Sequence, residues 1–148
     1  MLRPSTRAQY ALRAMIELAR HEGNGPVRLR RVAEAQRISP KYLEQLTIPL
    51  RRAGLVSALR GPSGGYALAR PAQEIMAREV VEAVEGSLST VTHVPDDAAG
   101  GHTRVCAAQD LWSRVGDAIA TVLAGTSLAD LRDAQQAAEA QQVSRYQI

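Results

Sequence analysis

Side chains that could bind a polyanion gather between Ile38 and Leu68. A serine, a lysine, a tyrosine and a glutamine fall close together, two arginines follow, and a third arginine precedes a turn with three glycines. Lysine and arginine neutralise phosphates, whereas serine, tyrosine and glutamine form hydrogen bonds with base edges or phosphates. The residues that could bind nucleic acid are therefore Ser39, Lys41, Tyr42, Gln45, Arg51, Arg52 and Arg60.

The spacing of apolar residues predicts a helix that positions most of these side chains. Apolar residues recur at intervals of three and four, at Tyr42, Leu43, Leu46, Leu50 and Ala53. Pro40 suits the first helical position, and Ser39 is expected to cap the helix with its side chain. Gly54 follows the last apolar residue and is expected to end the helix.

A strand, a glycine turn and a second strand are predicted to follow this helix. Residues 55–60 and 66–68 flank the sequence Gly61-Pro62-Ser63-Gly64-Gly65. Glycine leaves the backbone bare, so the turn can approach a phosphate or enter a narrow groove. Helix, glycine turn and hairpin together are typical of a winged helix-turn-helix that binds double-stranded DNA. The alternative is a solvated basic helix beside an ordinary hairpin.

Each candidate side chain has an expected place on the DNA. We expect Lys41 and Gln45 to reach base edges in the major groove, with Ser39 and Tyr42 bonding a base or a phosphate. Arg60, with the wing residues Ser63, Gly64 and Gly65, is expected in the minor groove. Phosphate contacts are expected from Arg7, Arg51 and Arg52, which otherwise are ordinary surface cations.

The charge distribution separates the two halves of the chain. Residues 1–80 carry thirteen arginines and one lysine against six glutamates, a net charge of +8, whereas residues 81–148 carry four arginines against nine acids, a net −5. This split fits a front half that meets a polyanion and a back half that meets protein.

Composition also argues against several classes of protein. The single cysteine, Cys106, excludes an internal disulfide, and no cysteine pair has metal-binding spacing. No apolar run approaches the length of a membrane span, and the first residues lack the apolar centre of a signal peptide, so a cytoplasmic protein is expected. No nucleophile, base and orienting group stand together, and an enzyme is not expected.

The remaining pattern predicts a mainly helical chain in three parts. Residues 1–86 form a winged helix-turn-helix domain in which a first helix, from Ser5 or Thr6 to about His21, and a short second helix precede the recognition helix. Residues 87–106 form a long loop.

Residues 107–148 contain an apolar helix from about Ala107 to Ala124, expected to join two copies into a homodimer, and a last helix that opens at Ser127. The alternative is that the apolar helix packs on the first helix as core. Residues 144–148 are expected to be a loose tail.

The run from Thr6 to Leu68 resembles the Rrf2 family of bacterial winged-helix regulators. The matching segments are Tyr10-Ala11-Leu12-Arg13-Ala14-Met15, residues 38–46, Ala53-Gly54-Leu55-Val56 and residues 60–66. This resemblance implies a DNA-binding transcriptional regulator, expected to act as a repressor on a pseudo-palindromic operator.

Some members of this family hold an iron–sulfur cluster through three cysteines in the segment that corresponds to residues 87–112. This chain has only Cys106 there, so we expect no cofactor and no metal site, with His93 and His102 as solvated loop residues. Cys106 is either an inert thiol or a redox sensor. In the second case the chain is a repressor that senses oxidant or ligand through Cys106 and the loop 87–105.

The likeness extends further, through residues 84–86, 110–119 and 126–131, to the branch of the family that represses cysteine metabolism. Such repressors work with cysteine synthase, O-acetylserine (thiol)-lyase, whose active site accepts peptides ending in isoleucine. The sequence ends Tyr146-Gln147-Ile148, which implies that these residues bind that enzyme. A carboxylate on an apolar side chain suits a pocket built for an amino-acid substrate. Gln147 departs from the expected pattern.

Overall fold

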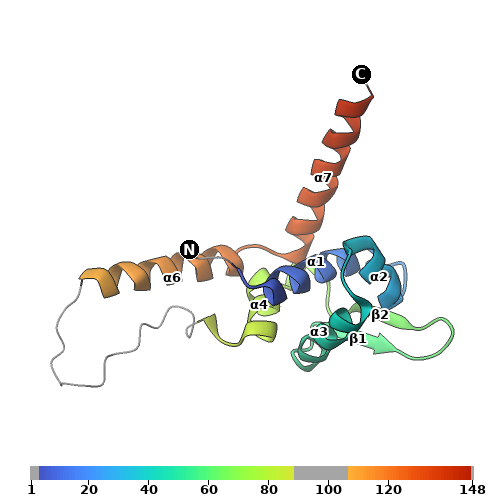
Figure 1. Cartoon of the computed structure of the whole chain (residues 1–148), viewed down its shortest axis with the longest axis horizontal. Coiled ribbons are helices and arrows are strands. Elements are labelled where there is room, and N and C mark those ends of the chain that lie inside the picture. Colours follow the sequence, from blue (N-terminus) through green and yellow to red (C-terminus); the bar gives the residue numbers. More distant parts are fainter. Residues whose placement is uncertain (1–3, 89–106, 148) are drawn as a thin grey trace.

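The structure, a computed structural model, describes residues 4–88 and 107–147. A small two-stranded sheet lies at the edge of a head formed by helices, and two further helices extend away from this head (Figure 1). The mainly helical architecture with a two-stranded wing confirms the predicted fold class. In chain order the elements are α1 (Thr6–Arg20), α2 (Leu29–Gln36), α3 (Pro40–Arg52), β1 (Val56–Leu59), β2 (Gly65–Leu68), the 3-10 helix η1 (Ala72–Glu74), α4 (Ala77–Glu85), α6 (Ala107–Ala124) and α7 (Leu128–Tyr146).

One hydrophobic core joins the helices of the head. The apolar face of α3 lies against α1, α2 and α4 and includes Leu43, Leu46 and Leu50, each at most 2% exposed. Met15 of α1 is buried in the same core. Burying a side chain of this size stabilises the fold by about 1.5–3 kcal/mol. The spacing that predicted the recognition helix is therefore the spacing of its buried face.

The turn between α2 and α3 has a defined geometry. Arg37 adopts the left-handed conformation, with φ 54° and ψ 46°, and ends α2. The next residue, Ile38, donates its N–H to the carbonyl of Ala33 at 2.9 Å and buries its side chain in the core. This closure is typical of a helix C-terminus and sends the chain sharply into α3.

The wing is anchored to the segment that precedes α2. Strands β1 and β2 are antiparallel, with Val56 opposite Leu68 and Leu59 opposite Gly65. On the other side of β2, Tyr66 exchanges two backbone hydrogen bonds with Val27, at 2.7 and 2.8 Å. Gly65 lies so close to Val27 that a Cβ there would overlap the Val27 carbonyl. The wing therefore rests on the α1–α2 connection as well as on its own hairpin.

A second junction attaches α7 to the head. Ala77 donates its N–H to the carbonyl of Thr126 at 2.8 Å, and Leu128 donates to the carbonyl of Ile75 at 2.9 Å. The side chain of Leu128 is fully buried in the main core. The burial of Leu128 shows that the first turn of α7 belongs to the core of the head. The predicted domain boundary at residue 106 stays a prediction.

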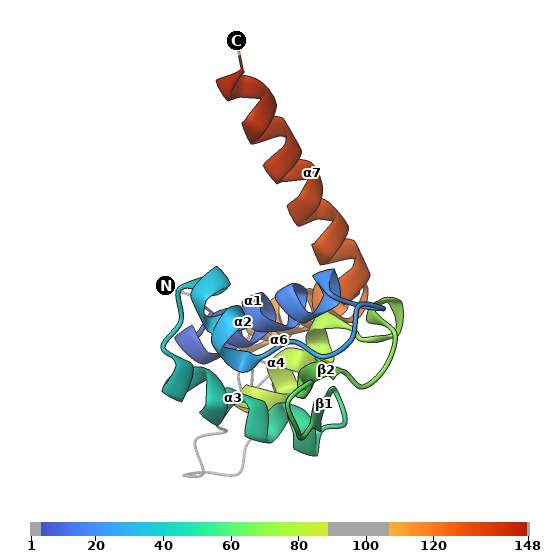
Figure 2. The same cartoon turned by 90° about the vertical axis from the view of Figure 1, so that its right-hand side faces the viewer.

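The prediction of a loose tail over residues 144–148 was wrong for its first part. Residues Ser144, Arg145 and Tyr146 are the last turn of α7, and Gln147 follows as its C-cap, while Ile148 lies outside the described residues. The sequence of α7 is rich in alanine and glutamine, which have high helix propensity, so the helix persists after its contacts with the head end. Figure 2 shows α7 projecting from the head.

Helix α6 leaves much of its apolar surface exposed. Leu111, Trp112 and Val122 are 53%, 47% and 66% exposed, whereas Gly116 is buried. Its contacts lie mainly with α4. Leu123, near the end of α6, packs against a small buried cluster that includes Ala8 of α1, so the alternative of packing on the first helix holds for this contact and not for the exposed residues. In the described ranges, no helix has the length and apolarity needed to cross a membrane.

Candidate nucleic-acid interface

Helix α3 separates a buried face from an exposed polar face. Lys41, Glu44 and Gln45 are exposed on the side opposite Leu43 and Leu46. Because residues three and four apart share a helix face, the apolar spacing also fixes which polar residues point away from the head. Lys41 and Gln45, four residues apart, thus form one exposed row that a DNA groove could admit.

The start of α3 differs from the prediction. Pro40 does occupy the first turn, but the side chain of Ser39 makes no capping hydrogen bond. Pro40 has no N–H to satisfy and brings a φ suited to a helix, while the backbone carbonyl of Ser39 accepts the N–H of Leu43 at 2.9 Å. The exposed hydroxyl of Ser39 consequently stays available to a ligand.

Tyr42 has a structural role beside any role on DNA. Its ring is half-buried and packs edge-on against Tyr10 of α1, with 5.8 Å between ring centroids. The guanidinium of Arg13 lies 5.4 Å from the centroid of Tyr10. These contacts fix the first turn of α3 against α1 and hold the ring of Tyr42 beside Lys41.

The predicted DNA-contacting cations are exposed and electrostatically unpaired. Within the described part of the chain, no ion pair involves Arg7, Lys41, Arg51, Arg52 or Arg60. Glu44, which could have paired with a neighbouring arginine, forms no ion pair in the same ranges. Other arginines do pair, as Arg70 does with Glu79 and Arg78 with Glu82. Unpaired cations keep their full attraction for phosphates, because no carboxylate must first be displaced.

Sequence reasoning missed Arg28, which ties the wing tip to the helical head. Its guanidinium donates a 2.6 Å hydrogen bond to the carbonyl of Pro62. Arg28 is also the residue that precedes α2. Its positive charge was visible in the sequence, but the two residues are 34 positions apart and no local pattern connects them.

The other candidate residues either lie outside the described residues or belong to the far end of α7. Cys106, His93 and His102 lie outside the described residues, as does Ile148. Tyr146 is 82% exposed at the far end of α7, away from the head (Figure 2). Among the residues that the structure describes, no group of three histidine, cysteine or carboxylate side chains could hold a metal ion.

The fold and this face define a winged-helix DNA-binding transcription regulator. Residues 4–134 match the family model Rrf2, described as an iron-dependent transcriptional regulator, and the chain belongs to the Rrf2 family. CymR of Bacillus subtilis is 41% identical over 127 residues, which cover 86% of this chain and 87% of CymR. IscR of Photorhabdus laumondii is 39% identical over 135 residues, with 91% of this chain and 82% of IscR covered.

Solved structures agree with the sequence relatives. CymR, the global cysteine regulator of B. subtilis, superposes with a TM-score of 0.79 at 41% identity, covering 90% of this chain and 98% of that one. The resemblance to the Rrf2 family and to its cysteine-regulating branch is thereby confirmed. So is the prediction of a transcription regulator rather than an enzyme, because the relatives regulate transcription.

Proposed function

We propose that the protein is a homodimeric repressor of genes of cysteine and sulfur metabolism that binds a pseudo-palindromic operator in double-stranded DNA. The observation that carries the proposal is the row of exposed, unpaired cations on α3 and beside the wing. The similarity of this chain to CymR, the global cysteine regulator of B. subtilis, supports the choice of cysteine and sulfur metabolism.

On DNA, α3 enters the major groove and the wing follows the adjacent minor groove. Lys41 and Gln45 contact base edges, and Ser39 and Tyr42 bond a base or a phosphate. Arg60 reaches into the minor groove, where Ser63, Gly64 and Gly65 let the backbone approach closely. The exposed guanidinium groups of Arg7, Arg51 and Arg52 bind phosphates.

Two copies pair through the exposed apolar stripe of α6. In a single copy the apolar side chains of this stripe are at least 37% exposed to solvent; they are Leu111, Trp112, Ile119 and Val122. A two-fold axis through this stripe places two α3 helices on two half-sites, which is why a pseudo-palindromic operator is expected.

The test of DNA binding is selection of bound sequences from a random duplex pool, followed by affinity measurements at several salt concentrations. Lys41→Ala should lose about 1–3 kcal/mol of discrimination at one base position, whereas Arg51→Ala should weaken all sequences alike and lower the salt slope by about 1. Arg145→Ala, at the end of α7, is the matched control and should bind as the unaltered protein does. Selection that recovers no common sequence would contradict the proposal.

Control of the repressor is proposed to run through cysteine synthase. The partner-binding residues are Tyr146, Gln147 and Ile148; α7 carries the first of these away from the head, where a large partner can reach it (Figure 2). When sulfur is plentiful, cysteine synthase is free to hold these residues. When sulfur is scarce, O-acetylserine competes for the same pocket and releases the repressor.

Light scattering after size-exclusion chromatography of the protein mixed with cysteine synthase tests this control. A complex should form, dissolve on addition of O-acetylserine, and fail to form when Ile148 is deleted. The control variant Ser144→Ala leaves residues 146–148 intact and should bind. If no complex forms, the alternative of a direct sensor gains support, and Cys106→Ser should then abolish release of DNA by oxidant.

A further inference from the structure

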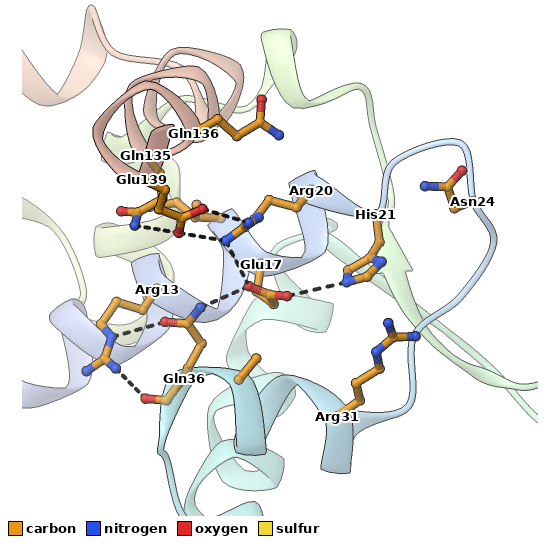
Figure 3. Close-up of a pocket in the computed structure, with 12 residues that line it drawn as sticks. Arg13, Glu17, Arg20, His21, Asn24, Arg31, Gln36, Gln135, Gln136 and Glu139 are labelled. Carbon is orange, nitrogen blue, oxygen red and sulfur yellow. Dashed lines mark hydrogen bonds and ion pairs between the residues drawn. The ribbon is translucent and has the colours of Figure 1, made fainter. Parts of the chain in front are cut away.

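A polar cleft of about 910 Å³ lies between α1, α2 and α7, away from the exposed row on α3. Figure 3 shows its walls: α1 supplies Glu17, Arg20 and His21, α2 supplies Arg31, and α7 supplies Glu139. Neither the DNA contacts nor the proposed partner contacts use it. Some of the polar side chains that line it already have hydrogen-bond or ion-pair partners within the protein, and others do not. The side chains without such partners indicate which ligand the cleft binds.

The carboxylate of Glu17 is buried and fully engaged. The residue is 8% exposed, and its carboxylate accepts a 3.0 Å hydrogen bond from the side-chain amide of Gln36 on α2. His21, one turn further along α1, places its Nε2 atom 3.3 Å from the other carboxylate oxygen. A buried charge with such partners has little attraction left for a cationic ligand.

The carboxylate of Glu139 on α7 also has hydrogen-bond donors within the protein. Arg20 donates two hydrogen bonds to its carboxylate, at 3.1 and 2.9 Å, in the forked geometry of a strong arginine–carboxylate pair. Gln135 donates a third at 2.9 Å. Both carboxylates of the cleft therefore already have hydrogen-bond partners within the protein.

The groups that remain without a partner include a cation and two amides. Across residues 4–88 and 107–147, the side chains of Arg31, Asn24 and Gln136 form no hydrogen bond or ion pair. All three line the cleft, and Arg31 extends from α2 on the side where His21 faces it from α1 (Figure 3). Guanidinium and amide donors without an acceptor match an oxyanion, which a guanidinium can hold through two parallel hydrogen bonds.

We propose that this cleft binds a small metabolite whose oxyanion, a carboxylate or phosphate group, pairs with the exposed guanidinium of Arg31, while the exposed amides of Asn24 and Gln136, at other points of the cleft wall, contact other polar groups of the same molecule. The apolar side chains of Ile16 and Ala35 in the same cleft leave room for the carbon skeleton. The ligand contacts α2 on one side and α7 on the other.

A ligand in the cleft would restrain the position of α3, the recognition helix. This consequence rests on the proposed function. Arg31 and Gln36 belong to α2, and α2 passes through the fixed turn at Arg37 directly into α3. A ligand that joins α2 to α7 restrains the helix-turn-helix relative to the helix that ends at Tyr146. The binding test below uses no DNA, so it can fail or succeed independently of operator recognition.

Backbone-amide NMR of the full chain, titrated separately with inorganic phosphate and with succinate at constant ionic strength, tests the proposal. The expected result is saturable shifts at Arg31 and its neighbours on α2 with at least one probe. Saturation by phosphate alone identifies a phosphate ligand, and saturation by succinate alone identifies a carboxylate. Shifts that never saturate, or that saturate only over residues 41–52 of the DNA-binding face, overturn the proposal.

Two arginine variants sharpen the test. Arg31→Gln should weaken probe binding at least tenfold, whereas Arg30→Gln should leave it unchanged, because Arg30 is paired with Glu34 on the exposed side of α2. If Arg31→Gln and Arg30→Gln bind the probe with equal affinity, Arg31 does not hold the oxyanion. Both side chains are exposed, and far-UV circular dichroism confirms that each variant is folded.

Discussion

The guanidinium of Arg28 donates a 2.6 Å hydrogen bond to the carbonyl of Pro62 at the tip of the wing. Arg28 precedes α2, while Val27 beside it is paired with Tyr66 of β2. Two consecutive residues thus hold both strand β2 and the tip of the wing against the head. The wing would present Arg60 to DNA in an orientation set before binding, which lowers the entropic cost of association.

Removal of the Arg28 side chain should loosen the wing tip more than it destabilises the protein. Arg28→Ala loses one exposed charged hydrogen bond, so the free energy of unfolding should fall by only about 1 kcal/mol. Operator affinity should fall several-fold, with protection lost at the flanking minor groove and kept in the major groove. Urea denaturation measures the first effect. Hydroxyl-radical footprinting of the sugars reports the minor groove, and dimethyl sulfate footprinting of guanine N7 reports the major groove. Uniform loss of protection over the whole operator would show that Arg28 does not act through the wing.

Gly65 should tolerate no side chain. Its φ is 154°, and a Cβ would overlap the carbonyl of Val27, so Gly65→Ala must push β2 away from its partner or break the Val27–Tyr66 pair. The expected loss of stability is about 1–3 kcal/mol. Gly61→Ala is the control, because Gly61 has φ 106° but open space around it. A thermal melt that ranks Gly61→Ala as the more damaging variant would contradict the packing argument.

Acid should weaken the start of α7 through Asp130. The N–H of Ser127 donates to the Asp130 carboxylate at 3.0 Å, and Asp130 donates its N–H to the Ser127 hydroxyl at 3.0 Å. The backbone N–H of Ser127, followed by its side chain, lowers the pKa of Asp130 below its usual value. Because the folded pKa is depressed, this contribution is complete above the unfolded pKa and is lost as pH falls through the folded value.

Asp130→Asn should accordingly be less stable than the unaltered protein at pH 7, with the difference shrinking in acid below the ordinary aspartate pKa. Urea midpoints at several pH values measure this. Asp117→Asn is the control, since Asp117 is exposed on α6 and forms no ion pair among the described residues. A difference between Asp130→Asn and the unaltered protein that stays constant with pH would exclude ionisation of Asp130 as its cause.

The apolar stripe of α6 should govern association. Val122 is 66% exposed on this stripe, and a charge in the interface would be buried without a partner, so Val122→Asp should raise the dimer dissociation constant at least tenfold. Ser113→Asp places the same charge on the opposite side of α6, since the nine residues between positions 113 and 122 make about two and a half turns, and it should leave association intact. Sedimentation equilibrium gives both constants. Equal weakening by the two variants would indicate that the stripe is not the interface.

Sequence by itself determined the elements whose signals are local. The three- and four-residue spacing of Leu43, Leu46 and Leu50 fixed α3, and Ser127 with Asp130 marked the start of α7. Segments shared with the Rrf2 family gave the class of protein before any coordinates. These features were predictable because backbone hydrogen bonding and face-by-face burial depend on neighbours within a few residues.

Tertiary structure decided the features that join distant parts of the chain. The Arg28–Pro62 bond, the close approach of Gly65 to Val27, and the Arg20–Glu139 pair across the cleft connect residues that no periodicity relates. The failure of Ser39 to cap α3 and the continuation of α7 through Tyr146 also needed coordinates. The physical reason is that a side chain commits its hydrogen bonds according to which groups folding brings within about 3 Å, and a one-dimensional pattern does not contain that distance.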